Sequence, residues 1–276
     1  MIADSACFPV RFNALILAGR RRSGDPVAAE AGVSHKCLAL AGGIPMLSRV
    51  AEALASSPNV DRIVVCIETP NVIETLPTIS SLMASQRLSS IAAAESPAAS
   101  VLAAVEQHHI ELPTLVTTAD HALLTREMVD EFIGGALRSA GDLTVALASA
   151  GRLFSAYPKS RRTVYRFRDD GYSGCNMFAV HTPEALAAFR FWRSIEQNRK
   201  RPWRIVRAFG MKPLFAYLFN RLTLAAAFQE ASGVLRVQTS PVVISTPDAA
   251  IDVDRPGDLE LVESILRRRF ESACAP

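Results

Sequence analysis

Four short apolar runs in the first 150 residues constrain the fold more than any other feature of this 276-residue chain. They occupy residues 12–18, 62–67, 114–118 and 143–149, and residues 90–93 form a weaker fifth run. The strong runs are rich in branched side chains and are apolar at successive positions instead of at alternate ones. This pattern is typical of strands that are buried on both faces of a parallel sheet.

Helical patterns lie between these runs, over residues 45–57, 97–108 and 127–138. The first two begin with proline, which suits the first turn of a helix, and Ser96 stands where a capping hydroxyl is expected. The alternation of strand and helix implies right-handed crossovers, with helices on both faces of the sheet. We therefore expect an α/β fold with three layers and a mostly parallel sheet.

The pattern changes after residue 150, where two strands around a turn, a helical insertion, a late strand and a final helix are expected. These elements fall at residues 163–167 and 177–180, with the turn at 169–174, then near 183–231, at 242–245 and at 256–270. Hydrophobic residues make up 49% of the chain and charged residues 21%, which excludes a disordered protein. Because no repeat or linker divides the sequence, we expect one domain over residues 1–276.

The cysteines and the hydropathy bear on the compartment. The five cysteines are scattered, with no CxxC or Cys/His ligand spacing, which argues against structural zinc and against a disulfide framework. No segment has the ~20 uninterrupted apolar residues that cross a bilayer. These features predict a cytoplasmic protein.

Residues 190–221 concentrate positive charge. They contain nine lysines and arginines and a single acid, Glu196, so that this segment carries +8 while the whole chain carries +3. The segment also holds both tryptophans. Arginine mixed with aromatic residues predicts peripheral contact with the inner face of a membrane, or a cover for a lipid-linked acceptor. The alternative is a solvated helical cover, and a nucleic-acid partner is not expected.

The loop after the first strand is a candidate site, because ligands of open α/β sheets bind beyond the carboxyl ends of the strands. From Leu17 to Lys36 it reads LAGRRRSGDPVAAEAGVSHK. Its glycines let the backbone approach a ligand, and its cations supply the donors that a triphosphate needs. The spacing is neither that of a Walker loop nor GxGxxG, and the alternative is a solvated basic loop.

This loop, followed by an apolar run and by Gly-Ile-Pro-Met-Leu at residues 43–47, resembles the opening of the molybdenum-cofactor guanylyltransferase-like NTP transferase family. The resemblance implies a Rossmann-like nucleotidyltransferase sheet whose first loop wraps the nucleotide phosphates. Where this chain has Arg20 the family pattern has a second glycine, and where it has Gly24 the pattern has an arginine. Carried over position by position, the nucleotide contacts are Leu17, Ala18, Gly19, Arg20, Arg22 and Lys36.

Carboxylates for a divalent metal are expected at two places. Asp120 follows the strand at 114–118, and the sequence AIDVDRPGDL at residues 250–259 resembles the last acidic motif of the same family. The resemblance assigns Asp120 and Asp254 to Mg²⁺, which prefers oxygen ligands. Asp252 lies two residues earlier, on the same side of an extended stretch. The alternative role of these aspartates is to cap or turn the chain before a helix.

The resemblance also implies pockets for the base and for the acceptor. Ser96 and Ser100 lie in the connection that the family uses for the nucleobase, although Ser96 also suits a helix cap. Arg162, Gly174 and Asn176 lie where relatives contact the acceptor. The Asn176 amide can donate and accept hydrogen bonds to a hydroxyl, and its alternative role is in a β-turn.

Together these features predict a Mg²⁺-dependent nucleotidyltransferase, with Arg20, Arg22, Lys36 and Asp120 as its catalytic residues. It would transfer a nucleoside monophosphate from CTP or GTP to a phosphorylated acceptor, such as a lipid or polyol phosphate, and release pyrophosphate. One alternative is a glycosyltransferase that uses an NDP-sugar, but the expected Asp-x-Asp after a mid-chain strand is replaced by Ala-Asp-His-Ala at 119–122. The other is a catalytically silent nucleotide-binding or membrane-recruitment module.

Overall fold

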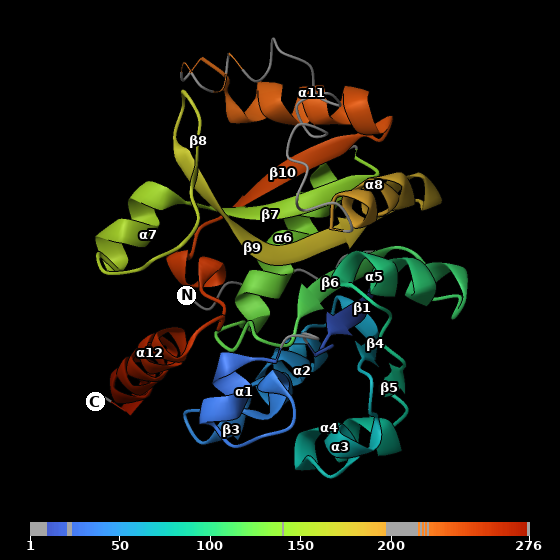
Figure 1. The fold of residues 1–276 in the computed structure, drawn as a ribbon, viewed down its shortest axis with the longest axis vertical. Coiled ribbons are helices and arrows are strands. Elements are labelled where there is room, and N and C mark those ends of the chain that lie inside the picture. Colours follow the sequence, from blue (N-terminus) through green and yellow to red (C-terminus); the bar gives the residue numbers. More distant parts are fainter. Residues whose placement is uncertain are drawn as a thin grey trace.

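The computed structural model describes residues 10–20, 24–139, 141–196, 215, 217, 219 and 221–274. An eight-stranded sheet runs through the molecule in the order β10-β7-β9-β6-β1-β4-β5, with β8 paired to β9 (Figure 1). All its pairs are parallel except those made by β9. Its strands are β1 (Phe12–Leu17), β4 (Val60–Cys66), β5 (Leu88–Ile91), β6 (Thr114–Thr118), β7 (Leu143–Ser149), β8 (Tyr165–Arg166), β9 (Gly171–Val180) and β10 (Thr239–Ile244).

The sheet is buried on both faces, as its continuous apolar strands predict. In β1, the side chains of Phe12, Ala14 and Ile16 join one hydrophobic core and that of Leu15 joins the other. Successive side chains of a strand point to opposite faces, so a strand must be apolar throughout when helices cover both. The predicted α/β class with a three-layer, mostly parallel sheet is therefore confirmed.

Helices form the two outer layers. One core packs α2 (Met46–Ser56), α6 (Arg126–Arg138) and α12 (Pro256–Cys274) against the sheet, and the other packs α5 (Pro97–Glu106) and α8 (Leu186–Glu196), which lie side by side in Figure 1. The remaining short elements are α1 (Pro26–Glu30), η1 (Lys36–Leu38), β2 (Leu40–Ala41), β3 (Ile44–Pro45), α3 (Asn71–Glu74), α4 (Pro77–Ala84), α7 (Ala150–Ala156), η2 (Pro183–Ala185), α11 (Leu224–Leu235) and η3 (Pro247–Ala250).

The turn predicted at residues 169–174 is wrong in its second half, because β9 already begins at Gly171. Residues 172–174 pair with the end of β7, and residues 171 and 172 pair with β8. Aspartate and glycine in this stretch suggested a turn, but pairing with neighbouring strands outweighs the local preference. Gly174, predicted as an acceptor contact in a loop, therefore lies inside a strand.

A bulge interrupts β9 just after Gly174. Between the pairs Leu147–Gly174 and Val145–Phe178, β7 advances by two residues and β9 by four. Asn176, within the bulge, has a φ of +49° in the left-handed region. Bulges redirect side chains at sheet edges and next to functional sites.

The predicted insertion near 183–231 is helical at its two ends, in η2 with α8 and in α11. Its centre, residues 197–214, and residues 216, 218 and 220 lie outside the described part of the chain. Among the described residues, none of the helices is long and apolar enough to span a membrane.

Candidate active site

Lys36 lies at the centre of the site. It opens the short helix η1, and its side chain is 17% exposed. The Nζ atom donates to Oδ2 of Asp120 at 2.5 Å and to the carbonyl oxygen of Val253 at 2.9 Å, and it lies 3.5 Å from Oδ1 of Asp254. One ammonium group thus joins the loop after β6 to the segment before α12.

Asp120 is positioned by the end of β6. Ala119 donates its N–H to the carbonyl oxygen of Leu17, which continues the pairing of β6 with β1 past both strand ends. The carbonyl oxygen of Asp120 then accepts from the N–H of Val253 at 3.1 Å. The side-chain Oδ1 atom of Asp120 is buried and makes no hydrogen bond with any described residue. A buried carboxylate oxygen without a partner is costly unless a cation or donor satisfies it.

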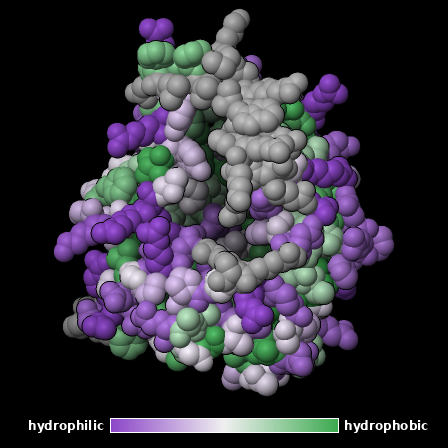
Figure 2. All heavy atoms as spheres, viewed as in Figure 1, coloured by the Kyte–Doolittle hydropathy of each residue, from purple (hydrophilic) through white to green (hydrophobic). Residues whose placement is uncertain are grey.

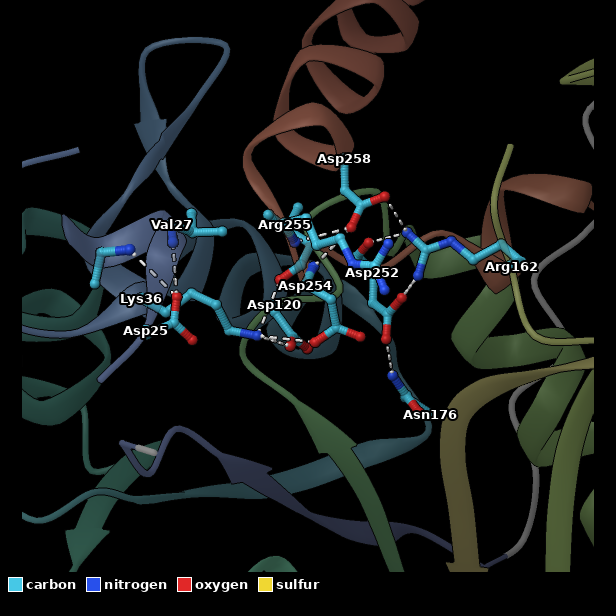
Figure 3. A network of polar contacts seen from close by, with 12 residues as sticks. Asp25, Val27, Lys36, Asp120, Arg162, Asn176, Asp252, Asp254, Arg255 and Asp258 are labelled. Atoms are coloured by element: carbon cyan, nitrogen blue, oxygen red, sulfur yellow. Dashed lines mark hydrogen bonds and ion pairs between the residues drawn. The ribbon is translucent and has the colours of Figure 1, made fainter. Parts of the chain in front are cut away.

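The three aspartates of the site converge. Asp120, Asp252 and Asp254 each offer a carboxylate oxygen within 4.8 Å of the other two (Figure 3). The structure thus brings together Lys36, Asp120 and Asp254, which sequence reasoning had placed in separate motifs. Asp252, named there only as a neighbour, is the third member of the cluster.

Arg162 and Asn176 contact Asp252 from the other side. The guanidinium group of Arg162, whose side chain is 9% exposed, forms an ion pair with the Asp252 carboxylate and donates to the Asp252 carbonyl oxygen. Asn176 donates from Nδ2 to Oδ2 of Asp252 at 2.5 Å. Burial lowers the pKa of Arg162, and the nearby carboxylates of Asp258 and Asp254 oppose this effect. Of the three predicted acceptor contacts, Arg162 and Asn176 therefore have protein partners.

The start of α12 is held by Asp258. Its Oδ2 atom accepts from the backbone N–H groups of Asp254 at 3.1 Å and Arg255 at 2.9 Å, and its Oδ1 atom lies 3.5 Å from Arg162. Such bonds satisfy N–H groups that a helix start leaves without partners. Asp258 therefore caps this end of α12, and a carboxylate oxygen of Asp254 belongs to the acidic cluster.

The glycine loop is anchored by a residue that the motif analysis did not single out. Glu68, two residues beyond β4, accepts the backbone N–H of Arg20 at 2.7 Å. A Cβ atom at Gly19 would lie 3.2 Å from the same Oε1 atom, so glycine permits this close approach. His35, which is 4% exposed, points Nε2 toward Glu68 at 3.8 Å, and its burial lowers its pKa. The sequence did offer a signal for Glu68, because this acid directly follows the strand predicted at residues 62–67.

A pocket of about 550 Å³ lies beside this loop. Its lining comes from the glycine loop and from residues 93–95, and it consists of Arg20, Gly24, Asp25, Ala28, Ala29, Val33, Ser34, Glu68, Ala93, Ala94 and Glu95. Figure 2, in the same view as Figure 1, shows hydrophilic side chains across the left and centre of this face, next to a hollow.

The two predicted base-contacting serines make hydrogen bonds within the protein. Ser96 accepts the N–H of Ala99 and caps α5, while the buried Ser100 accepts the N–H of Ala94 at 3.0 Å. Only the Ser100 hydroxyl group holds the 93–95 segment, and neither serine lines the pocket.

The structure describes only some of the other residues of the glycine loop. Gly24 has a φ of +83°, a conformation that an arginine at the family position would not readily adopt. Leu17 and Ala18 continue the sheet, and Ala18 is buried. Arg22 lies outside the described residues, as do Arg21 and Ser23.

The donor set of the cluster fits a hard divalent cation. Three carboxylates converge, oxygen is the ligand that Mg²⁺ prefers, and one of the oxygens is buried without a partner among the described residues. Asp120, Asp252 and Asp254 are the residues that could hold such an ion.

A mostly parallel sheet with a glycine loop after its first strand and an acidic centre at its carboxyl edge is the architecture of an α/β nucleotidyltransferase. The chain belongs to the MobA-like NTP transferase family, whose model matches residues 14–207. It is a nucleotidyltransferase, as the resemblance of its motifs implied.

Solved structures show the same fold. A hypothetical transferase from Thermus thermophilus superposes with a TM-score of 0.76 at 26% identity, covering 91% of this chain and all of the other. A 4-diphosphocytidyl-2C-methyl-D-erythritol synthase from Anaerococcus prevotii (TM-score 0.55, 11% identity) covers 94% of this chain and 97% of its own. A CMP:2-keto-3-deoxy-manno-octonic acid synthetase in complex with CTP (0.54, 16%) covers 94% and 99%. No curated protein sequence matches the chain significantly.

Proposed function

We propose that this enzyme transfers a nucleoside monophosphate from CTP or GTP to a phosphorylated small-molecule acceptor and releases pyrophosphate. The observation that carries the proposal is the convergence of Lys36 with Asp120 and Asp254. Lys36 ends the glycine loop, so the cation and the two carboxylates meet where that loop rejoins the fold.

The reaction needs no protein nucleophile. An oxygen of the acceptor phosphate forms a bond to the α-phosphorus, the bond from the α-phosphorus to the oxygen that bridges to the β-phosphate breaks, and its electron pair leaves with pyrophosphate. Lys36 supplies a fixed positive charge near the phosphates, and Arg20 and Arg22 are proposed to bind them from the loop. Such catalysis depends on positioning and on preorganised charge.

Mg²⁺ is the proposed cofactor, held by Asp120 and Asp254 with Asp252 beside them. When bound, it would neutralise charge on the phosphates. The chain itself contributes the buried Oδ1 atom of Asp120 and the ion pair that keeps Lys36 in place.

The nucleotide is proposed to be CTP or GTP. Two of the structural neighbours carry cytidyl or CMP in their names, and one of them was solved with CTP, which supports CTP. The motif resemblance to guanylyltransferases supports GTP. The pocket offers the carboxylates of Glu68 and Glu95, and a carboxylate can accept from the amino group of either base.

The acceptor is proposed to be a phosphorylated polyol or a lipid phosphate. Peripheral contact with the inner face of a membrane was predicted for residues 190–221, most of which lie outside the described residues. Of its cations, Arg190 and Arg193 form ion pairs with Glu106 and Glu95 of this chain at 2.5 and 2.6 Å. These two arginines therefore stabilise the packing of α8 beside α5.

The test is pyrophosphate release by the purified chain with Mg²⁺, each of the four NTPs and a metabolite extract, followed by mass spectrometry of the product. We expect one NTP to give pyrophosphate and an NDP-linked product. A glycosyltransferase would consume an NDP-sugar without forming pyrophosphate, and a silent module would bind a nucleotide without turnover. Either result would overturn the proposal.

A further inference from the structure

The position of Arg162 does not suit a contact with the acceptor. Its guanidinium group is buried against Asp252 and lies 3.5 Å from Asp258, and the side chain is only 9% exposed. An arginine that recognises a soluble phosphate needs free donors facing the solvent or the pocket. In Figure 3, Arg162 extends toward the aspartates at the start of α12.

The network has two halves that meet at the segment 252–254. In one half, Lys36 contacts Asp120 and Asp254. In the other, Arg162 and Asn176 hold Asp252, which leaves that carboxylate already paired with a cation and an amide donor. The two halves therefore have different roles. The Lys36 half contacts the glycine loop, and the Arg162 half holds the backbone at residues 252–254.

The anchoring extends to the backbone of Asp254. Arg162 lies against Asp258, and Asp258 accepts the N–H group of Asp254. Arg162 also donates to the carbonyl oxygen of Asp252. The peptide units before and after Val253 are thereby held on both sides, and this sets where the Asp254 carboxylate lies.

The side chains that contact one another in this network carry more negative than positive charge. Two cations, Lys36 and Arg162, contact four carboxylates, those of Asp120, Asp252, Asp254 and Asp258. Carboxylates are ionised at neutral pH, so these six side chains carry a net charge of −2. One divalent cation would balance that charge, whereas without Arg162 the excess would be −3.

We infer that Arg162 is a positioning residue for the metal site: it neutralises Asp252 and holds the start of α12, so that Asp254 meets Asp120. The inference rests on the proposed metal-dependent function and departs from the acceptor role that the motif resemblance implied. Residues that orient metal ligands through hydrogen bonds typically contribute 10- to 100-fold to metal affinity.

The test uses the full-length protein and Mn²⁺ alone, with free Mn²⁺ measured by electron paramagnetic resonance. Arg162→Met is expected to weaken Mn²⁺ binding by about tenfold or more. Arg162→Lys should recover part of the loss, since it restores the charge without the planar fork. Arg161→Met is the matched control, because Arg161 is adjacent and exposed, and it should bind Mn²⁺ as the unaltered protein does.

A second variant keeps the inference testable if Arg162→Met does not fold. Asn176→Gly removes the amide that holds Asp252, and glycine readily adopts the φ of +49° at this position. We expect it to weaken Mn²⁺ binding in the same direction, with its melting curve as the check on folding.

Kinetics separate the two roles of Arg162. A positioning role predicts that Arg162→Met raises the Mg²⁺ concentration for half-maximal rate and leaves the KM for the acceptor unchanged. Unaltered Mn²⁺ binding with a raised acceptor KM would overturn the inference in favour of direct acceptor contact. It would also be overturned if the unaltered protein showed no saturable Mn²⁺ binding. If the protein bound Mn²⁺ as expected but released no pyrophosphate, the proposed function would fail and the role of Arg162 would stand.

Discussion

The Nζ atom of Lys36 lies 2.5 Å from Oδ2 of Asp120, although 84 residues separate the two in the chain. Lys36 comes from the helix that ends the glycine loop, and Asp120 follows the central strand β6. The contact links the segment expected to bind phosphates to the segment expected to hold the metal. Lys36 and Asp120 are therefore the pair whose alteration tests the proposed chemistry most directly.

Asp120→Ala is expected to lower the rate of pyrophosphate release by about a hundredfold or more, since a proposed ligand of the metal that would neutralise the phosphates is lost. Far-UV circular dichroism should remain close to that of the unaltered protein, because the backbone bonds of residue 120 do not depend on its side chain. Asp120→Asn is the matched control for shape. Near-normal turnover by the alanine variant would refute a metal role for this carboxylate.

Lys36→Met should change the response of stability to Mg²⁺. Without the ammonium group, the mostly buried Asp120 carboxylate loses its cation, which we expect to lower the free energy of unfolding by about 1–3 kcal/mol. A divalent cation can replace the missing charge, so added Mg²⁺ should raise the melting temperature of this variant more than that of the unaltered protein. Differential scanning fluorimetry with and without Mg²⁺ measures both effects. Equal shifts in the two proteins would contradict the prediction.

Glu68 is expected to act through the glycine loop. Glu68→Ala removes the acceptor for the Arg20 N–H and should raise the KM for the nucleotide several-fold, with a smaller effect on kcat. Glu68→Gln keeps an oxygen that can accept this bond, and it should preserve most of the affinity. Initial rates over a range of NTP concentrations give the KM and kcat of each variant. If glutamine were as harmful as alanine, the negative charge and not the hydrogen bond would be what the loop requires.

The buried cysteines should resist thiol reagents in the folded protein. Burial raises the pKa of Cys37 to about 12, and it also raises the pKa of Cys66 and Cys175. The thiolate is the reactive form, so little of it is present in the native state at pH 8. Peptide mass spectrometry after brief iodoacetamide treatment should find these three residues unlabelled at pH 8 and labelled in denaturant. Rapid native labelling of Cys37 would contradict its burial.

The sheet could be predicted because each of its main strands carries its own signal. A strand covered on both faces must be apolar at every position, and residues 114–118 and 143–149 match β6 and β7 exactly in extent. The hairpin of β8 and β9 was harder, because its glycines and asparagine favour a turn when only local preferences are considered. Pairing with β7 and β8 outweighs those preferences, and only the folded sheet supplies these partners.

For the site, the order of residues along the chain was enough to predict which side chains follow the strands: the glycine loop after β1, Asp120 after β6 and the Asp-x-Asp before α12. Their residue types already indicated phosphate and metal chemistry. How these side chains meet is visible in the folded chain alone, where Lys36 lies 3.5 Å from Asp254 across 218 residues and Arg162 pairs with Asp252. The fold also places Glu68 under the glycine loop. This difference arises because motif patterns report local preference, whereas the partner of a charged side chain is set by the packing of segments far apart in the chain.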